Sequence, residues 1–298
     1  MMRVACVGEA MVELSLDAAP STAARLGFAG DVLNTAIYLK RSAPELQVDF
    51  VTRVGRDAFS DRMVGFIAAE EVGTGAIGRR DDRNVGLYAI TTDAQGERSF
   101  TYWRDSSAAR TLFQAPDGPD FSVLEGYDVV YLSAITLAIL SPDVRGALMT
   151  WLDEFRAHGG RVAFDSNYRP RLWPDEATAR AAIERAWRSC DIALPSVDDE
   201  MAVFGDPDAP AVLERLTGWG VRDGALKRGA DGPVSLGEAV EAQYAPAAQV
   251  VDTTAAGDSF NGGYLAAALT GRGQRDALRA GHDLASMVVG VKGAIAPR

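Results

Sequence analysis

Short runs of apolar and β-branched residues alternate with helical stretches along most of this chain, and this alternation constrains the fold more than any other feature. The runs that predict strands are 3–7, 48–54, 129–132, 161–164, 192–194 and 225–226. The stretches that predict helices between them include 60–71, 142–158 and 175–189. Strands that alternate with helices imply right-handed crossovers and a mostly parallel sheet covered on both faces. The sequence therefore predicts an α/β fold.

Two segments interrupt this alternation early in the chain. Residues 13–29 show no helical period, and residues 84–103 have the pattern of a β-hairpin with its turn at 93–96. We expect them to form a small β-sheet, as lid segments at about 13–29 and 84–104 inserted in a single domain that spans 1–298. The pattern alone does not separate a flap over a ligand from an exposed or dimerising sheet.

The charge and composition of the chain restrict its partners. The 298 residues include 30 Lys+Arg and 41 Asp+Glu, a formal net charge of −11, which excludes general binding to nucleic-acid phosphates and anionic membrane surfaces. No apolar run approaches the roughly 18 residues of a membrane span and no signal-peptide pattern is present, so a cytoplasmic location is expected. Two Cys and two His are too few for a disulfide framework, a zinc cluster or a multi-histidine site.

The strongest chemical signal lies near the C-terminus, in the segment VVDTTAAGDSF at 250–260. We expect a short strand ending at Asp252, then small residues, then a helix from near Gly257 to Leu269. Small residues let the backbone approach a ligand closely, and the unpaired amides of a helix N-terminus bind anions. Asp258 in the first turn is placed to accept a proton from a substrate hydroxyl; the alternative is an acid that only caps the helix. Neither a Gly-x-Gly-x-x-Gly fingerprint after the first strand nor a Walker A loop is present.

The segment DTTAAGD at 252–258 resembles the Asp-Thr-x-Gly-Ala-Gly-Asp signature of the ribokinase-like (PfkB) carbohydrate kinases. Three further motifs follow in the family's order: AGDxxN at 29–34 at the sugar-binding edge, LPSVDDE at 194–200 beside phosphates and magnesium, and KRGADG at 227–232 along the nucleotide. The resemblance covers nearly the whole chain. It implies a three-layer α/β/α domain with a mostly parallel sheet and a small β-sheet lid.

Three other segments resemble the 2-keto-3-deoxygluconate kinases of that family: GEAMVEL at 8–14, YWRDxSA at 102–108 and DSNYRPxLW at 165–173. The resemblance implies ATP-dependent phosphorylation of the terminal hydroxyl of a sugar acid, with Mg²⁺, and with a monovalent cation such as K⁺ as a family expectation. An Arg fork suits the carboxylate of such a substrate, and two arginines stand in these segments. Homo-oligomers joined through the lid sheets are implied as well.

The roles that the resemblance implies fall on a defined set of residues. The catalytic group comprises Asp258 as general base with Gly257, Ala256 and Ala255 around the transferring phosphoryl group. The sugar acid is expected to meet Gly30, Asn34, Tyr88, Tyr102, Arg104 and Arg169. The nucleotide is expected to meet Asn167, Ser196, Lys227, Gly229, Gly232 and His282, and Asp199 is the candidate for magnesium, through phosphate or water.

The chain departs from the family pattern at three of these motifs. Ala29 and Ala255 each stand where the family has Gly, and Ser196 replaces Asn. An added Cβ is tolerated where φ is negative and costs more where φ is positive. Two alternatives to a sugar-acid kinase remain: a PfkB kinase of the fructokinase or ribokinase type, and, because of Ala255, a catalytically weak sugar- or nucleotide-binding protein.

Overall fold

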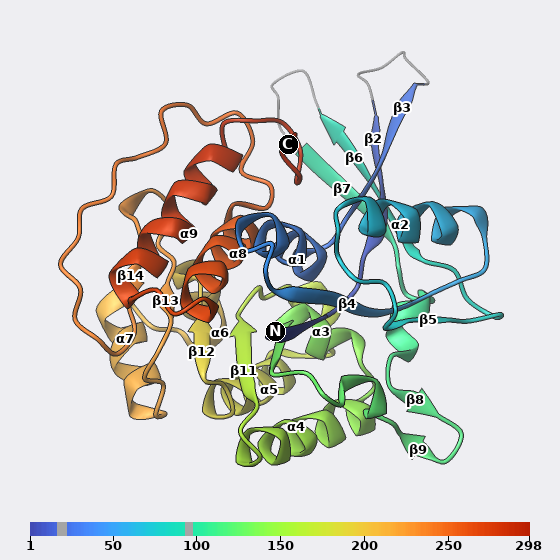
Figure 1. The fold of residues 1–298 in the computed structure, drawn as a ribbon, viewed down its shortest axis with the longest axis horizontal. Helices are drawn as coiled ribbons and strands as arrows, with labels where there is room; N and C mark the ends of the chain where they lie inside the picture. The colour runs from blue at the N-terminus through green and yellow to red at the C-terminus, as the bar shows by residue number, and fades with distance from the viewer. Residues whose placement is uncertain (17–22, 93–97) are drawn as a thin grey trace.

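A six-stranded parallel sheet forms the centre of the computed structural model, which describes residues 1–16, 23–92 and 98–298 (Figure 1). The strand order is β12-β11-β10-β1-β4-β5, and every neighbouring pair is parallel. The bounds are β1 (Arg3–Val7), β4 (Gln47–Val54), β5 (Ile77–Arg79), β10 (Val129–Ser133), β11 (Arg161–Asp165) and β12 (Ile192–Leu194). The expected α/β fold is confirmed.

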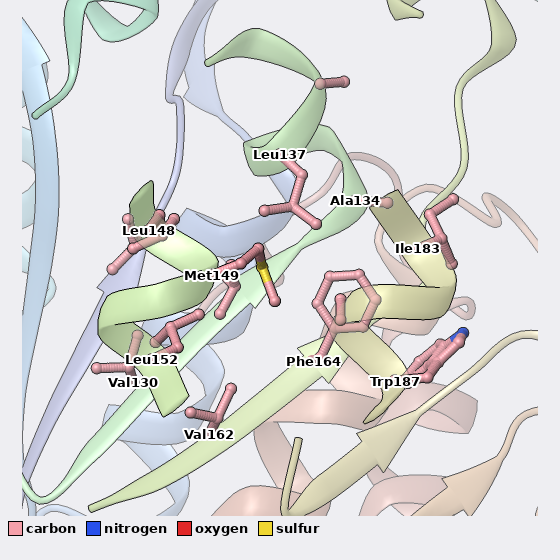
Figure 2. Close-up of a cluster of buried hydrophobic side chains, with 14 of the residues drawn as sticks. Val130, Ala134, Leu137, Leu148, Met149, Leu152, Val162, Phe164, Ile183 and Trp187 are labelled. Carbon is pink, nitrogen blue, oxygen red and sulfur yellow. The ribbon is translucent and has the colours of Figure 1, made fainter. Parts of the chain in front are cut away.

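Alternation along the strands builds one apolar core on each face of this sheet. Ala5 and Val7 of β1 pack on one side, whereas Val4 and Cys6 pack on the other, because successive side chains of a strand point to opposite faces. The first face is covered by α3 (Ala134–Ile139), α4 (Pro142–Ala157), α5 (Glu176–Arg188), α6 (Val197–Phe204) and α7 (Ala209–Gly218). Figure 2 shows part of that core, where Phe164 meets Trp187 edge to face.

The second face is covered by α1 (Asp31–Ser42), α2 (Ala58–Ala69), α8 (Ala256–Leu269) and α9 (Gln274–Val288), and all of these except α2 also line the candidate site. Close packing of α8 depends on glycines, since a Cβ at Gly262 would lie 2.6 Å from Cβ of Tyr38 on α1 and one at Gly263 would lie 2.6 Å from the Ala280 carbonyl oxygen on α9. The described helices include none that is long and apolar enough to cross a bilayer.

A second sheet stands away from the main one and is called the small sheet here (Figure 1). Its order is β3 (Ala24–Ala29), β2 (Met11–Leu16), β6 (Gly86–Thr92) and β7 (Arg98–Trp103). The pairs β2–β3 and β6–β7 are antiparallel, and β2–β6 joins them in parallel. The expected hairpin is confirmed on both strands, while its turn at 93–96 and residues 17–22 of the first lid segment lie outside the described residues.

Short elements complete the fold. Two small antiparallel pairs are β8 (Gln114–Ala115) with β9 (Gly118–Pro119) and β13 (Ala225–Leu226) with β14 (Val234–Ser235). The 3₁₀ turns are Ala108–Thr111, Ser122–Leu124, Pro170–Leu172 and Gly229–Asp231. The predicted strand 225–226 forms, and it is flanked by two isolated bridges, Ala193 with Gly224 and Ser196 with Lys227, rather than joined to β12 by a continuous ladder.

The strand predicted to end at Asp252 is wrong. Residues 248–255 are described and contain no strand. The amides of Val251 and Asp252 instead both donate to the carbonyl of Val289, just past α9. Val250 and Val251 are 62% and 49% exposed, so their β-branched side chains are not buried on a sheet face.

Candidate active site

The carboxyl ends of the central strands, the small sheet and the N-terminus of α8 enclose a cavity of about 1490 Å³. Such an edge is where open α/β sheets bind ligands. All of the candidate residues from the sequence except Gly232 line it: Gly30, Asn34, Tyr88, Tyr102, Arg104, Asn167, Arg169, Ser196, Asp199, Lys227, Gly229, Ala255, Ala256, Gly257, Asp258 and His282. Gly232 is not among the lining residues; it ends the 229–231 turn with φ 73°, and its backbone packs on Tyr244.

Asp258 lies in the first turn of α8, held by helix α1. The side-chain amide of Asn34 donates to its Oδ2 at 2.8 Å, and the Thr35 hydroxyl donates to its carbonyl oxygen at 3.1 Å. Burial raises the pKa of Asp258 to about 7, and the neighbouring Asp31 and Asp165 add to that shift, against the opposing effects of Asn34 and Lys227. A carboxyl group with a pKa near neutrality is suited to exchange a proton with a bound hydroxyl.

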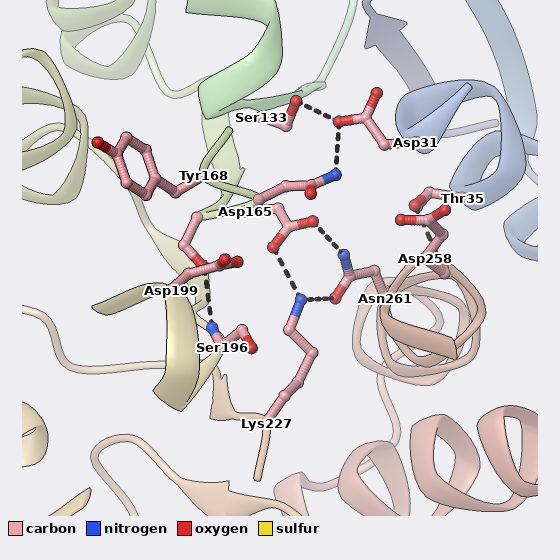
Figure 3. Close-up of polar contacts among 12 residues, drawn as sticks. Asp31, Thr35, Ser133, Asp165, Tyr168, Ser196, Asp199, Lys227, Asp258 and Asn261 are labelled. Carbon is pink, nitrogen blue, oxygen red and sulfur yellow. Dashed lines mark hydrogen bonds and ion pairs between the residues drawn. The ribbon is translucent and has the colours of Figure 1, made fainter. Parts of the chain in front are cut away.

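Two further acids, Asp31 and Asp165, line the cavity beside Asp258 (Figure 3). Asp31 accepts hydrogen bonds from the Ser133 hydroxyl and, at 2.9 Å, from the Asn167 amide. Its pKa is raised mainly by burial. The sequence predicts Asn167 at the nucleotide, and the structure shows its amide bonded to an acid at the start of α1.

Lys227 connects the nucleotide-loop motif to α8. Its Nζ donates to Asp165 at 2.8 Å and to Oδ1 of Asn261 at 3.1 Å. The side-chain amide of Asn261 donates in turn to Asp165 at 2.9 Å (Figure 3). All three bonds are internal, so the ammonium is fixed rather than free to swing. A Cβ built on Gly257 would lie 3.7 Å from Nζ, which places this positive charge beside the N-terminus of α8.

Sequence reasoning missed Glu9, Asp31, Asp165 and Asn261 as members of this site. Asp165 follows a predicted parallel strand, and Asn261 stands three residues after Asp258 on the same helix, so position gave a signal for both. Glu9 and Asp31 stand inside the GEAMVEL and AGDxxN segments that carry the family resemblance, which was the only signal for them.

The turn that opens α8 is strained at Ala255. This residue adopts φ 61° and ψ 17°, the left-handed region that a β-carbon disfavours. The amide of Ala256 donates to the Thr253 carbonyl at 3.2 Å, so it is engaged within the turn. Ala29, the other departure from a family glycine, ends β3, is 4% exposed and does not have a positive φ.

The two arginines expected at the sugar acid occupy different surroundings. Arg104, just after β7, is 7% exposed and pairs through Nη2 with Glu9, while its Nε has no hydrogen-bond partner. The Arg169 side chain is 55% exposed, donates to the Tyr168 carbonyl at 2.8 Å and lies 3.8 Å from Asp199. Arg169 is therefore the more accessible cation of the two.

The aromatic residues of the small sheet face one another across β6 and β7. Tyr88 and Tyr102 are directly paired in register with ring centroids 5.7 Å apart, and the Tyr88 hydroxyl donates to Glu13 on β2. Tyr88 is 7% exposed, whereas Tyr102 is 47% exposed. Packing and cavity lining coexist here, as amphipathic aromatic side chains allow.

Asp199, on the first turn of α6, is the acid that the sequence predicts for magnesium. Burial raises its pKa, and its contacts include a 3.3 Å hydrogen bond from the Ser166 hydroxyl and Arg169 at 3.8 Å. Ser196 donates its backbone amide to the same Ser166 hydroxyl at 2.8 Å. No cluster of three metal-ligating side chains occurs among the described residues. One carboxylate fits Mg²⁺, because this ion usually keeps waters and substrate phosphates as its other ligands.

His282 and Gly229 also line the cavity. His282 on α9 is 7% exposed, and its Nε2 lies 2.8 Å from the Ala245 carbonyl oxygen, with its ring 5.0 Å from that of Tyr244. The residue thus attaches the segment before Asp252 to α9. Gly229 adopts φ 54° in the turn after Lys227.

A parallel sheet with helices on both faces, a small sheet beside it and a cavity at its carboxyl edge define the ribokinase-like fold. The family model described as pfkB family carbohydrate kinase matches residues 1–298. The chain belongs to this family and is a carbohydrate kinase that binds a sugar substrate and ATP.

Relatives of known name support the assignment. The 2-dehydro-3-deoxygluconokinase of Dickeya dadantii (strain 3937) is 45% identical over 302 residues, covering 99% of this chain and 96% of that protein. The 2-dehydro-3-deoxygluconokinase of Escherichia coli (strain K12) is 42% identical over 304 residues, covering 99% and 97%. The crystal structure of a putative ribokinase II from E. coli in complex with ATP and Mg²⁺ superposes with a TM-score of 0.83 at 22% identity, covering 99% of this chain and 94% of that one.

Proposed function

We propose that this protein catalyses ATP-dependent phosphorylation of the terminal hydroxyl of 2-dehydro-3-deoxygluconate, also called 2-keto-3-deoxygluconate. Relatives that carry that name are 45% and 42% identical over 99% of the chain. The observation that carries the proposal is one cavity lined by both a carboxyl of pKa about 7, Asp258, and two arginines, Arg104 and Arg169. The acid suits proton transfer from a hydroxyl, and the arginines suit a substrate carboxylate.

Asp258 acts as the general base in this proposal. Its ionised form accepts the proton of the terminal hydroxyl, while Asn34 fixes the orientation of the carboxylate. The N-terminus of α8 and the ammonium of Lys227 stabilise negative charge on the phosphoryl group as it transfers. Mg²⁺, held through Asp199, supplies charge neutralisation on the ATP phosphates when bound.

The remaining candidate residues bind and orient the two substrates. Gly30, Tyr88 and Tyr102 line the sugar side of the cavity, and a Cβ at Gly30 would lie 2.2 Å from the Glu9 carbonyl oxygen. We assign Asn167, Ser196, Gly229 and His282, which line the same cavity, to the nucleotide, whereas Gly232 does not line it. The proposal also includes a cytoplasmic location, as expected from the sequence. It includes K⁺ as an activating cation, which exchange of K⁺ for Na⁺ in the assay tests.

Association through the small sheet is part of the proposal. Strand β7 is an edge strand whose residues Phe100, Tyr102 and Trp103 are 40%, 47% and 59% exposed. An exposed aromatic edge is the kind of surface that a second copy covers. Light scattering coupled to gel filtration should give a mass above 31.7 kDa, and Trp103→Asp should lower it. A monomeric wild-type protein would contradict this part.

The experiment that tests the activity is a coupled ADP-release assay with 2-dehydro-3-deoxygluconate, its galactonate epimer, fructose and ribose. We expect turnover on a sugar acid to exceed that on either neutral sugar by at least a factor of ten. Preference for fructose or ribose would indicate a fructokinase or ribokinase type, and ligand binding without ADP release would indicate a binding protein.

A further inference from the structure

A buried acid in the cavity wall has no part in the mechanism above. Glu9 follows β1, is 1% exposed and lines the cavity. Its Oε2 accepts a hydrogen bond from Nη2 of Arg104, but its Oε1 has no hydrogen-bond partner among the described residues. A buried acceptor left without a donor is costly, so such an atom at a ligand cavity indicates a partner that arrives with the ligand.

The backbone at the start of β6 packs closely against one side of this carboxylate. A Cβ on Gly86 would lie 2.8 Å from Oε1 of Glu9 and 3.2 Å from Cβ of Arg104. Gly86 opens β6 opposite Met11, and its φ is not in the left-handed region, so the need for glycine here is one of space. The small sheet therefore meets the core at a place shaped around the Glu9–Arg104 pair.

The chemistry of a carboxylate limits what can meet Oε1. Paired with Arg104, Glu9 only accepts hydrogen bonds, so its partner must donate one. The carboxylate and the ketone of an open-chain 2-keto-3-deoxy sugar acid only accept, and C3 carries no oxygen. Counting from the carboxylate, the first donor of such a substrate is the hydroxyl on C4.

The pairing with Arg104 favours that hydroxyl as the donor to Glu9. Nε of Arg104 has no hydrogen-bond partner, so it retains a donor for the substrate carboxylate. A substrate that places its carboxylate on Arg104 then has C4 as the nearest hydroxyl-bearing carbon to the residue bonded to that arginine. The gluconate and galactonate forms of the substrate differ in configuration at C4.

We propose that Glu9 binds the C4 hydroxyl of the sugar acid and determines which C4 epimer the enzyme prefers, with Oε2 orienting Arg104 and Oε1 accepting from the hydroxyl. This inference rests on the proposed sugar-acid kinase function. It makes Glu9 a specificity-determining residue that contacts the substrate directly.

The test is Glu9→Gln, assayed for kcat and KM on both epimers. Glutamine keeps the size but loses the charge that makes this acceptor strong, and hydrogen bonds to charged groups are the stronger kind. We expect the ratio of kcat/KM between the preferred and the other epimer to fall about tenfold. The change should appear in KM for the sugar acid, with KM for ATP within a factor of two of wild type.

Matched variants separate recognition from loss of a buried ion pair. Glu70→Gln removes the charge from a second Glu–Arg pair, Glu70 with Arg41. Their side chains are 13% and 17% exposed, and neither residue lines the cavity. It should lower the Tm as Glu9→Gln does but leave the epimer ratio unchanged. Gly86→Ala keeps the charges of Glu9 and Arg104 but places a β-carbon against Oε1 of Glu9, so it should also lower the epimer ratio. It provides the test if Glu9→Gln does not fold.

The outcomes for the two proposals are distinct. A wild-type protein that phosphorylates neither epimer contradicts the proposed function itself. A wild-type protein that is active on a sugar acid, with an epimer ratio that neither Glu9→Gln nor Gly86→Ala changes, overturns the role of Glu9 while the function stands.

Discussion

The side-chain amide of Asn34 on α1 donates a 2.8 Å hydrogen bond to Oδ2 of Asp258 on α8, across 224 positions of sequence. The contact joins two motifs that lie near opposite ends of the chain. It persists because α1 and α8 pack directly on each other, with glycine at the closest approach. Asn34 therefore orients the acid that we assign as the base and lowers its pKa relative to burial alone.

Replacement of Asp258 by Asn should remove catalysis and leave binding. The amide preserves size and burial but cannot accept the proton of the terminal hydroxyl. We expect kcat to fall by about 10²- to 10⁴-fold, the usual share of a general base. Titration calorimetry should give a Kd for the sugar acid within severalfold of wild type. Near-normal kcat would remove Asp258 from the role of base.

The pH dependence of kcat should report the pKa of Asp258. The base works only when ionised, so kcat should fall as the pH drops through about 7. Asn34→Ala removes a hydrogen bond that favours the ionised form, so the acid limb should move to higher pH, by about one unit. Measurement at saturating sugar acid and ATP separates this from weakened binding. A limb that stays in place would show that another group titrates.

The two arginines should respond differently to alanine. Arg169→Ala should raise KM for the sugar acid about 10- to 100-fold without a change in Tm, because its side chain is 55% exposed. Arg104→Ala should raise KM as well, and should destabilise the fold by about 3–5 kcal/mol because Glu9 is left buried without a counter-ion. Fructose supplies the control, since a neutral sugar should show little change in KM. An equal rise for fructose would contradict carboxylate recognition.

Periodicity predicted the elements of the fold but not the contacts among the buried acids. The strand at 3–7 and the helix at 175–189 follow from local sequence, and both formed as expected. The bonds from Asn261 to Asp165 and from Asn167 to Asp31 span 96 and 136 positions, and no local pattern encodes them. The β-branched pair Val250–Val251 misled the prediction of a strand, because a strand also requires a neighbour to pair with.

The candidate site was predictable to the extent that motifs mark it. Asp258, Asn34 and Lys227 stand in recognisable segments, and the structure brings them to one cavity. Their electrostatics were not predictable, because burial and the proximity of Asp31 arise only in the folded chain. The conformation of Ala255 was not predictable for the same reason, since composition does not determine the sign of φ.

Glycine at position 255 should stabilise the protein. Ala255 adopts φ 61°, where an L side chain costs roughly 1 kcal/mol or more. Relief of this strain should exceed the added entropy of the unfolded chain, so Ala255→Gly should raise the free energy of unfolding by about 0.5–1 kcal/mol. Ala268→Gly, inside the same helix, should lower it by about 1 kcal/mol. Urea denaturation measures both, and a loss of stability in Ala255→Gly would show that the turn is not strained.

Asp258 should also shape the dependence of stability on pH. Its pKa is raised in the folded state from an ordinary 3.8 to about 7, so folding favours the protonated form. The contribution is fully present below about pH 4 and is lost as the pH rises through 7. The side chain of Asp258→Asn is neutral at every pH, so this variant should match wild type in free energy of unfolding at pH 4 and exceed it by a few kcal/mol at pH 8. The difference corresponds to about 1.4 kcal/mol for each unit between the folded and unfolded pKa values. Denaturation of the two proteins at pH 4, 6 and 8 measures this difference, and a difference that does not change with pH would mean that Asp258 ionises as readily in the folded chain as in the unfolded one.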